Sequence, residues 1–254
     1  MLAIELVVVC IISAVAAYLG TLMVNRRMSL VAGPLGHLAL PGVALAFLFH
    51  WDLFLSAAAC VLFGGLLVWF FRRVSHLPFE TLTGIAFAFG LALGLLFLPM
   101  EHAEEAISGK VELIKLEDLA IALFVAVVVF LLLEKVKHDI VLLSLSEDLA
   151  RTMGVSPEMC DLVYLLAIAL TTAAEVKIVG GVLTVALVIL PAASAVHLAK
   201  SLRFYQVLAI VLAVFGALLG MGLHVLSGLS AGPLIVLVDV GLFFVSLGLR
   251  HLLR

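Results

Sequence analysis

The chain has 254 residues, of which 65% are hydrophobic and only 12% are charged, and its formal net charge is −3. Its mean hydropathy is +1.35, whereas soluble domains are only about 45–50% apolar. This composition excludes an ordinary soluble enzyme. It predicts an all-α, polytopic transmembrane bundle that forms a single domain over residues 1–254. The three cysteines have no paired spacing, so they predict neither a disulfide framework nor a zinc site.

Apolar stretches recur about nine times, each close to the roughly 20 residues that a transmembrane helix needs. Only a predicted tight turn near Glu175–Lys177 separates the sixth stretch from the seventh, so a count of eight is the alternative. Gly90-x-x-x-Gly94 and Gly216-x-x-x-Gly220 predict close contacts between helices. The expected spans are 2–24, 30–49, 53–71, 81–99, 118–136, 160–176, 178–198, 205–226 and 232–250.

The distribution of basic residues predicts the orientation, because cytoplasmic loops carry an excess of Lys and Arg. With the N-terminus outside, only Lys110, Lys115 and Lys177 fall on the outer side, which leaves eleven of the fourteen basic residues inside. We therefore expect the N-terminus outside and the C-terminus inside. Arg26-Arg27 follow the first span and no positive charge precedes it, so we expect a retained anchor and not a cleaved signal peptide.

The sequence has no nucleotide-binding loop. Its only Gly-Lys pair, Gly109-Lys110, is followed by Val111 instead of Ser or Thr. ATP hydrolysis is therefore expected in a separate chain, and this chain is not expected to be an enzyme. Few acids lie deep in the spans, namely Asp239 and Glu175, which disfavours a carrier driven by ions alone. No basic patch for nucleic acid is present.

The longest expected cytoplasmic segment, 137–159, contains the pattern of one short helix at about 144–158. Ser146 is a suitable N-cap with acids after it, Gly154 suits the left-handed C-terminal position, and Pro157 prevents continuation. A solvated connector and a helix that docks into a cytoplasmic partner both fit this pattern. The residues assigned to the docking helix are Ser146, Glu147, Asp148, Leu149, Ala150, Arg151 and Gly154.

Five stretches, in order along the chain, resemble the membrane permeases of ABC-type metal-ion importers. Ser146–Val155 is similar to the coupling segment of that family, and Lys177–Ala195 is similar to its signature ending in Pro-Ala-Ala-Ser-Ala. Gly36–Leu45 resembles its His-x-x-x-[Leu/Pro]-Gly-Val-Ala-Leu stretch, and Glu80–Gly84 and Ala231–Leu237 also have counterparts. The helix-breaking and signature residues are Gly36, Pro41, Gly42, Gly180, Pro191, Ala192, Ala193, Gly232 and Pro233.

The resemblance implies a permease in a prokaryotic cytoplasmic (inner) membrane that moves zinc, manganese or iron inward by alternating access. The divalent metal ion would be its substrate, with no permanently bound cofactor. The implied partners are a second copy of the chain, a pair of cytoplasmic ATPase subunits, an extracytoplasmic metal-binding protein and the lipid bilayer. A permease for a chelated metal or a cobalamin-like ligand, a stand-alone ion-coupled carrier and a membrane enzyme are the alternatives.

His37 is the leading candidate for contact with the ion. The Gly and Pro residues around it should break the helix, and broken backbone at membrane depth lies against protein or lines a water-filled cavity. Imidazole suits zinc, manganese or iron. In the family an aspartate commonly lies four residues before this histidine, whereas here Gly33 takes that place. The alternative is a histidine that bonds to a neighbouring helix.

Two acids complete the candidate set. Asp239 is expected to face the bundle, where it would meet His37 or accept a hydrogen bond from another helix. Glu175 is expected near the outer end of its span, beside the path or paired with Lys177. The acidic outer loop at about 100–117 predicts either a loose capture site for cations or a solvated loop.

Overall fold

The computed structural model of the chain describes residues 2–25, 29–75, 77–98, 114 and 116–252; at 2, 29–32, 147, 177–183 and 252 it describes the helix but not the side chains. All regular elements in these ranges are helical, which confirms the predicted all-α class. They are α1 (Leu2–Asn25), α2 (Ser29–His37), α3 (Ala39–Phe49), α4 (Leu53–Ser75), α5 (Phe79–Phe97), α7 (Leu116–Leu145), α8 (Glu147–Thr152), α9 (Pro157–Val196), α10 (Leu202–Ser227) and α11 (Ala231–Leu252).

Seven helices in the described ranges are long and apolar enough to cross a membrane: α1, α4, α5, α7, the first half of α9, α10 and α11. Two shorter apolar helical stretches, at 33–49 and 184–196, lie where the other two spans are expected. The first of these runs through α2 and α3, and the second is the latter half of α9. Most of the expected outer loop at about 100–117 lies outside the described residues.

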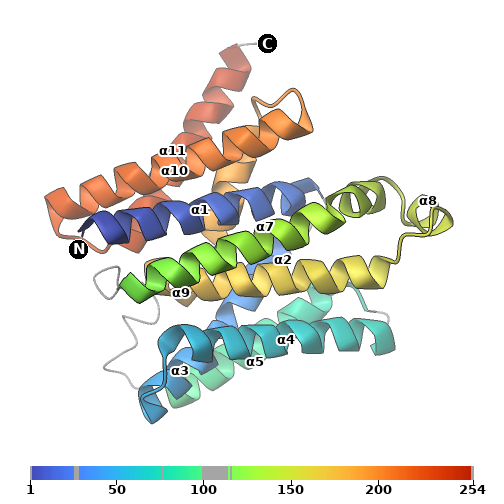
Figure 1. Ribbon diagram of the computed structural model, residues 1–254, viewed down its shortest axis with the longest axis horizontal. Helices are drawn as coiled ribbons and strands as arrows, with labels where there is room; N and C mark the ends of the chain where they lie inside the picture. Colours follow the sequence, from blue (N-terminus) through green and yellow to red (C-terminus); the bar gives the residue numbers. More distant parts are fainter. Residues whose placement is uncertain (1, 26–28, 76, 99–113, 115, 253–254) are drawn as a thin grey trace.

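The tight turn predicted near Glu175–Lys177 is wrong, because α9 continues through it as one helix of 40 residues. No proline lies between Pro157 and Pro191, and a backbone that stays helical keeps its N–H groups bonded, which hydrocarbon requires. Figure 1 shows the latter half of α9, in light orange, leaving the line of the first half, in yellow. α9 therefore changes direction without a loop.

The helix expected to end at 136 continues further, because α7 extends to Leu145. The reason is that apolar residues keep a helical spacing beyond the predicted end at 136, so the same face of α7 stays covered. The buried residues on this part of α7 are Val129, Leu133, Val136, Ile140 and Leu143.

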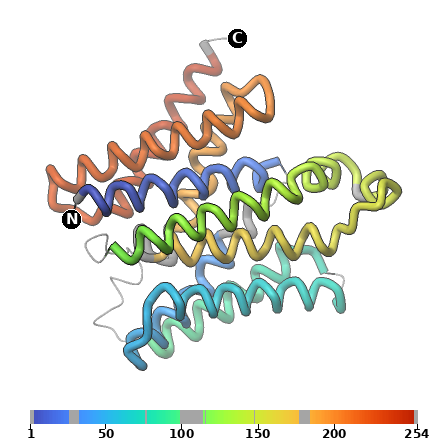
Figure 2. The backbone as a smooth tube through the Cα atoms, in the orientation of Figure 1, coloured from blue at the N-terminus to red at the C-terminus, as the bar shows by residue number. Residues whose placement is uncertain are grey.

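α9 is the central element of the bundle, since it packs against α1, α2, α4, α7, α10 and α11. Figures 1 and 2 show α1, α7 and the first half of α9 side by side, with α4 and α5 on one side and α10 and α11 on the other. The N-terminus lies at one end of these helices, and α8 lies at the opposite end.

Glycines at helix crossings bring backbones into direct contact. A Cβ on Gly20 of α1 would lie 1.9 Å from the carbonyl oxygen of Val188 in α9. A Cβ on Gly220 of α10 would lie 2.6 Å from the Cα of Ile235 in α11, and Gly216 faces α11 as well. In lipid, such close packing replaces the hydrophobic drive that holds soluble helices together. The contact predicted for Gly216-x-x-x-Gly220 is thereby confirmed.

The Pro-Ala-Ala-Ser-Ala stretch near the end of α9 serves packing of the same kind. Ala192 and Ala195 are fully buried and form one cluster with Ala17 of α1 and with Ala209 and Ala213 of α10. The short side chains let α1 and α10 approach α9 from two directions. This part of the signature is therefore a three-helix contact.

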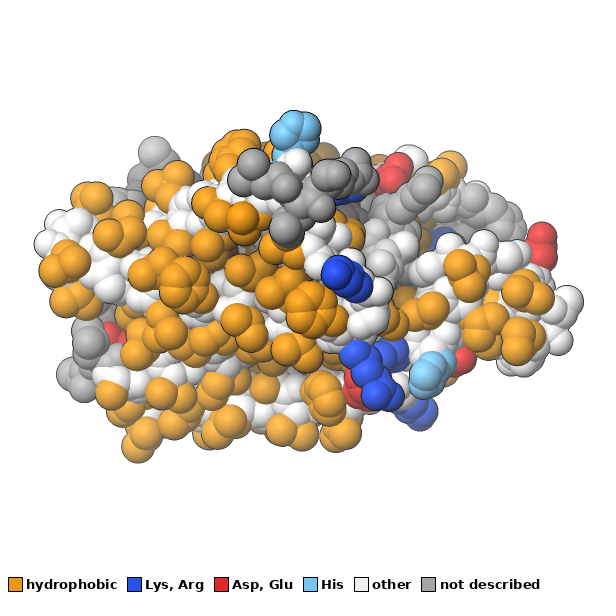
Figure 3. Space-filling model, turned by 90° about the horizontal axis from the view of Figure 1, so that it is seen from above, with side chains coloured by type: hydrophobic (Ala, Val, Ile, Leu, Met, Phe, Trp, Pro, Cys, Tyr) orange, Lys and Arg blue, Asp and Glu red, His pale blue; other side chains and the backbone are white. Residues whose placement is uncertain are grey.

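The surface separates apolar and charged side chains. In Figure 3, hydrophobic side chains cover most of the visible face, and the blue basic side chains gather toward the half that carries α8. Exposed apolar residues on α4, α5, α7, α10 and α11 agree with contact between these helices and lipid.

We predict that Gly20→Ala lowers the thermal stability of the purified protein in detergent. The added Cβ would meet the carbonyl of Val188, and overpacking of this kind costs about 1–3 kcal/mol, against a gain of about 1 kcal/mol in helix propensity. Gly222→Ala in α10 is the matched control, since its Cβ would meet nothing within 4 Å. Equal melting temperatures for the two variants would contradict the packing argument.

Candidate functional site

The second predicted span is broken at Leu38, in agreement with its Gly and Pro pattern. α2 ends at His37 and α3 begins at Ala39, and the N–H of Leu38 donates to the carbonyl of Leu35 at 3.1 Å. Pro41 lies in the first turn of α3 and has no N–H to donate to the carbonyl of His37, four residues earlier. The break therefore leaves that carbonyl without its regular helical donor.

The side chain of His37 lies beside this break. Its ring meets Phe87 of α5 edge to face, with centroids 4.6 Å apart and an interplanar angle of 84°. The residue is half-buried, and its Nδ1 has no hydrogen-bond partner in the part of the chain that the structure describes. The alternative of a histidine bonded to a neighbouring helix thus gains no support from the described residues. A buried ring nitrogen without a described partner therefore adjoins the helix break.

Leu38 itself is held in a notch between α4 and α5. A Cβ on Gly64 would lie 2.2 Å from Cδ1 of Leu38, and a Cβ on Gly90 would lie 3.0 Å from its Cδ2. α3 also lies directly on α4, because a Cβ on Gly42 would come within 2.4 Å of the carbonyl oxygen of Ser56. These glycines couple the position of the break to α4 and α5.

Gly33, which stands where the family commonly has an aspartate, faces an apolar surface. A Cβ there would meet the side chain of Val185 in α9 at 3.5–3.9 Å. The described residues contain no group of three or more His, Cys, Asp or Glu side chains that could hold a metal ion. At Gly33, the described structure therefore has an apolar contact with α9 where a carboxylate–imidazole pair with His37 would otherwise form.

The two candidate acids are buried but are not brought together with His37. The carboxylate of Asp239 lies on Gly216, where a Cβ would come within 1.9 Å of its Oδ1, so Asp239 belongs to the contact between α10 and α11. Glu175 is completely buried in α9. The carboxylate oxygens of both acids have no hydrogen-bond partner within the described ranges. The predicted pairing of Glu175 with Lys177 lies outside the described side chains.

The inner segment folds locally as its sequence predicts. The Oγ of Ser146 accepts a hydrogen bond from the N–H of Leu149 at 3.3 Å and so caps α8. Gly154 has a φ of +82°, the left-handed conformation that favours glycine. Pro157 then starts α9 at the position where a missing N–H has no cost. The side chain of Glu147 lies outside the described ones.

α8 is anchored on one face and bare on the other. Beneath it, Ala150 packs with Leu143 of α7 and Cys160 of α9 in a small apolar cluster. Three apolar side chains in or next to α8 are exposed: Leu145 at the end of α7 at 78%, Leu149 of α8 at 50% and Met153 at the C-cap of α8 at 63%. We call these three residues the α8 ridge. An exposed apolar ridge on a polar, protruding segment is typical of a protein interaction site.

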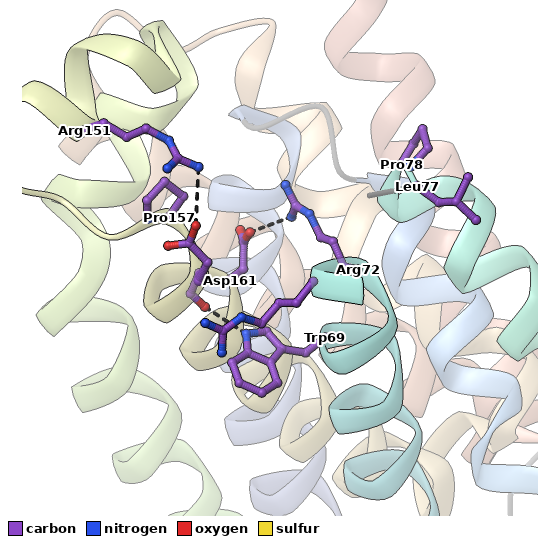
Figure 4. A pocket seen from close by; sticks show the side chains of 9 residues that line it. Trp69, Arg72, Leu77, Pro78, Arg151, Pro157 and Asp161 are labelled. Atoms are coloured by element: carbon purple, nitrogen blue, oxygen red, sulfur yellow. Dashed lines mark hydrogen bonds and ion pairs between the residues drawn. The ribbon is translucent and has the colours of Figure 1, made fainter. Parts of the chain in front are cut away.

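A pocket of about 560 Å³ opens between α8, the start of α9, the end of α4 and the start of α5. Figure 4 shows the contacts on its walls. Arg72 pairs with Asp161 at 2.5 Å, and Arg151 pairs with Glu158 at 3.3 Å. The indole Nε1 of Trp69 donates to the backbone carbonyl of Glu158 at 2.9 Å. These contacts join α4, α8 and α9 at the end of the bundle that carries α8.

Sequence reasoning did not single out this pocket, because its basic residues served only as markers of membrane orientation. A signal was present. Trp69, Arg72 and Arg73 lie at the end of one apolar stretch, and Asp161 lies at the start of another. A buried acid at the boundary of a span needs a basic partner, which the two arginines could have supplied.

The remaining signature residues have structural places. Gly232 and Pro233 lie in the first turn of α11, where proline is tolerated. Pro191 lies inside α9, and Ala193 is half-buried beside it. Gly180 belongs to the part of α9 whose side chains are not described.

This arrangement has counterparts among known proteins. The chain is 28% identical over 245 residues to the "Manganese import system permease protein ScaB" of Streptococcus gordonii, which covers 95% of this chain and 88% of that one. It is 28% identical over 241 residues to a "Probable iron transport system membrane protein" of Haemophilus influenzae, with 93% and 89% covered.

A solved structure shows the same fold. PsaBC from Streptococcus pneumoniae, in complex with Fab, superposes with a TM-score of 0.83 at 26% identity, over 95% of this chain and 89% of that one. Residues 1–250 match the model of the ABC 3 transport family. The match spans nearly the whole sequence, and the chain belongs to the ABC 3 transport family.

Proposed function

We propose that the chain is the permease subunit of an ATP-binding-cassette importer that moves a divalent transition-metal ion, namely zinc, manganese or iron, into the cytoplasm by alternating access. The observation that carries this proposal is α8, a capped helix with an exposed apolar ridge at the end of the bundle opposite the N-terminus. Family membership supports a transport role, and the manganese and iron permeases among the relatives support the choice of cargo.

The proposed topology has nine crossings, with the N-terminus outside and the C-terminus inside. α2 and α3 together make the second crossing, and the two halves of α9 make the sixth and seventh. The bend of α9 supports this count, since a straight helix of 40 residues would be about 60 Å long, twice the roughly 30 Å of hydrocarbon. The position of α8 at the end opposite the N-terminus supports the orientation.

The proposed partners follow from alternating access. A pair of ATPase subunits would bind the α8 ridges from the cytoplasm, and a second copy of the chain would complete the central path. An extracytoplasmic metal-binding protein would deliver the ion. His37 is the proposed pathway ligand, because its Nδ1, which has no partner among the described residues, and its carbonyl, which Pro41 deprives of the regular helical donor, both belong to the break in the second crossing. A single imidazole binds weakly enough to release an ion that must keep moving.

The first test is elemental analysis of cells that express the chain together with the ATPase and binding protein encoded beside it. Zinc, manganese, iron, nickel and cobalt are measured together. We expect one metal to accumulate severalfold above cells that carry an ATPase unable to hydrolyse ATP. Equal metal contents in the two strains, at equal expression, would contradict the proposal.

Leu149→Glu should weaken the binding of the ATPase without unfolding the permease, because Leu149 is half-exposed. Burial of a leucine contributes about 1.5–3 kcal/mol, so the affinity should fall roughly tenfold or more. Copurification and titration of the two subunits measure the change. Leu229→Glu, at an exposed site between α10 and α11, is the control. Normal binding by Leu149→Glu would remove the α8 ridge from the interface.

His37→Ala should reduce metal uptake while membrane abundance stays unchanged. The substitution removes a ring nitrogen without a partner and an edge contact with Phe87, so its effect on folding should be small. His251→Ala, at an exposed position near the end of α11, serves as the control. Uptake by His37→Ala at the rate of the control would exclude His37 from the path.

A further inference from the structure

The end of α4 is joined to the start of α9 by two bonds whose register is unusual. The two helices run in opposite directions, and Gly65 lies opposite Leu165, whose carbonyl oxygen is 3.9 Å from where a Cβ of Gly65 would be. In such a pair, Trp69, four residues after Gly65, lies level with Asp161, four residues before Leu165. By the same count Arg72 lies level with Glu158.

The observed bonds do not join the level pairs. Trp69 donates to the carbonyl of Glu158, and Arg72 pairs with Asp161, so the pairing is crossed relative to the level residues, although the two bonds lie one above the other (Figure 4). The paired residues are offset by three positions in each case, or about 4.5 Å along the helix axis, and the side chains take up this offset because the bonds themselves are 2.9 and 2.5 Å long. We call these two bonds the crossed brace. Sliding α9 along α4 would stretch both of these short bonds, so the crossed brace resists shear between the two helices.

The crossed brace is built on a buried acid and connects directly to α8. The side chain of Asp161 is 4% exposed, whereas that of Arg72 is 30% exposed. An ion pair with one partner buried is costly to break, since breaking it leaves an uncompensated charge. Glu158, which accepts from Trp69 through its backbone, also holds Arg151 of α8 through its carboxylate. A displacement of α8 therefore reaches α4 through a single residue.

α4 in turn reaches the break beside His37. Gly64 lies five residues before Trp69 in α4, and it holds Leu38, the residue at the break, in the notch that it forms with Gly90. The chain of contacts thus runs from α8 through Glu158 and the crossed brace to α4, and then to the broken helix.

We propose that α4, locked to α9 by the crossed brace, is the element that transmits the movement of α8 to the break at Leu38. Trp69, Arg72 and Asp161 are then positioning residues that keep ATP hydrolysis coupled to metal movement. This inference rests on the proposed function. It adds the route by which a push on the cytoplasmic side opens or closes the path.

The test uses the complete complex, permease with its ATPase, in liposomes, and measures metal transported and ATP hydrolysed in the same sample. Trp69→Phe removes the indole donor, and Arg72→Gln removes the ion pair together with the contact of the guanidinium with the ring of Phe79. Arg203→Gln is the control, because Arg203 is an exposed arginine of α10 that does not line this pocket.

We expect complexes that carry Trp69→Phe or Arg72→Gln to transport at least about fivefold less metal per ATP hydrolysed. A roughly fivefold change is the lower end of the usual range for the coupling between two sites. ATP hydrolysis itself should continue, and Arg72→Lys should recover part of the ratio because it keeps the charge. The control should behave as wild type.

An unchanged ratio in both variants would overturn the inference, and so would a proportional fall of transport and ATP hydrolysis, which indicates a merely structural role. A wild-type complex that hydrolyses ATP without moving any metal would instead overturn the proposed function, and the inference with it.

Discussion

Hydrocarbon supplies no partner for a backbone N–H, and most of this structure follows from that constraint. Helices satisfy the backbone internally, which is why α9 continues through two glycines instead of opening into a loop. Helices that are satisfied internally gain little by merely meeting in lipid, so they depend on close packing. Gly20, Gly216 and Gly220 supply that closeness. The small residues of the signature do the same for α1, α9 and α10.

The break at Leu38 is the exception to this constraint, and protein surrounds it. Pro41 removes one donor, and the freed carbonyl of His37 lies close to Gly90 of α5, at 3.0 Å from a Cβ there. Helix α4 holds the other side. Irregular backbone at this depth is therefore stabilised by two straight helices that leave room for it with glycine. The same glycines that permit the break also connect it mechanically to the cytoplasmic end of α4.

Sequence patterns predicted most helices, the break at Leu38 and the local shape of α8, because these depend on residues near one another in the chain. The course of α9 was not predictable in the same way, since two glycines and a charged pair suit both a turn and a bent helix. The crossed brace was beyond sequence reasoning as well. Asp161 and Arg72 are far apart in the chain, and only the antiparallel packing of α4 and α9 decides which residues are level.

The length of α7 has a consequence for the whole assembly. Its 30 residues make a rod of about 45 Å, some 15 Å longer than the hydrocarbon layer is thick. The length of α7 therefore sets how far α8 lies from the other end of the bundle. Each residue added to or removed from the last turns of α7 would swing α8 by about 100° and shift it by about 1.5 Å. The final turns of α7 thus fix both the distance of α8 from the bundle and the direction in which α8 faces.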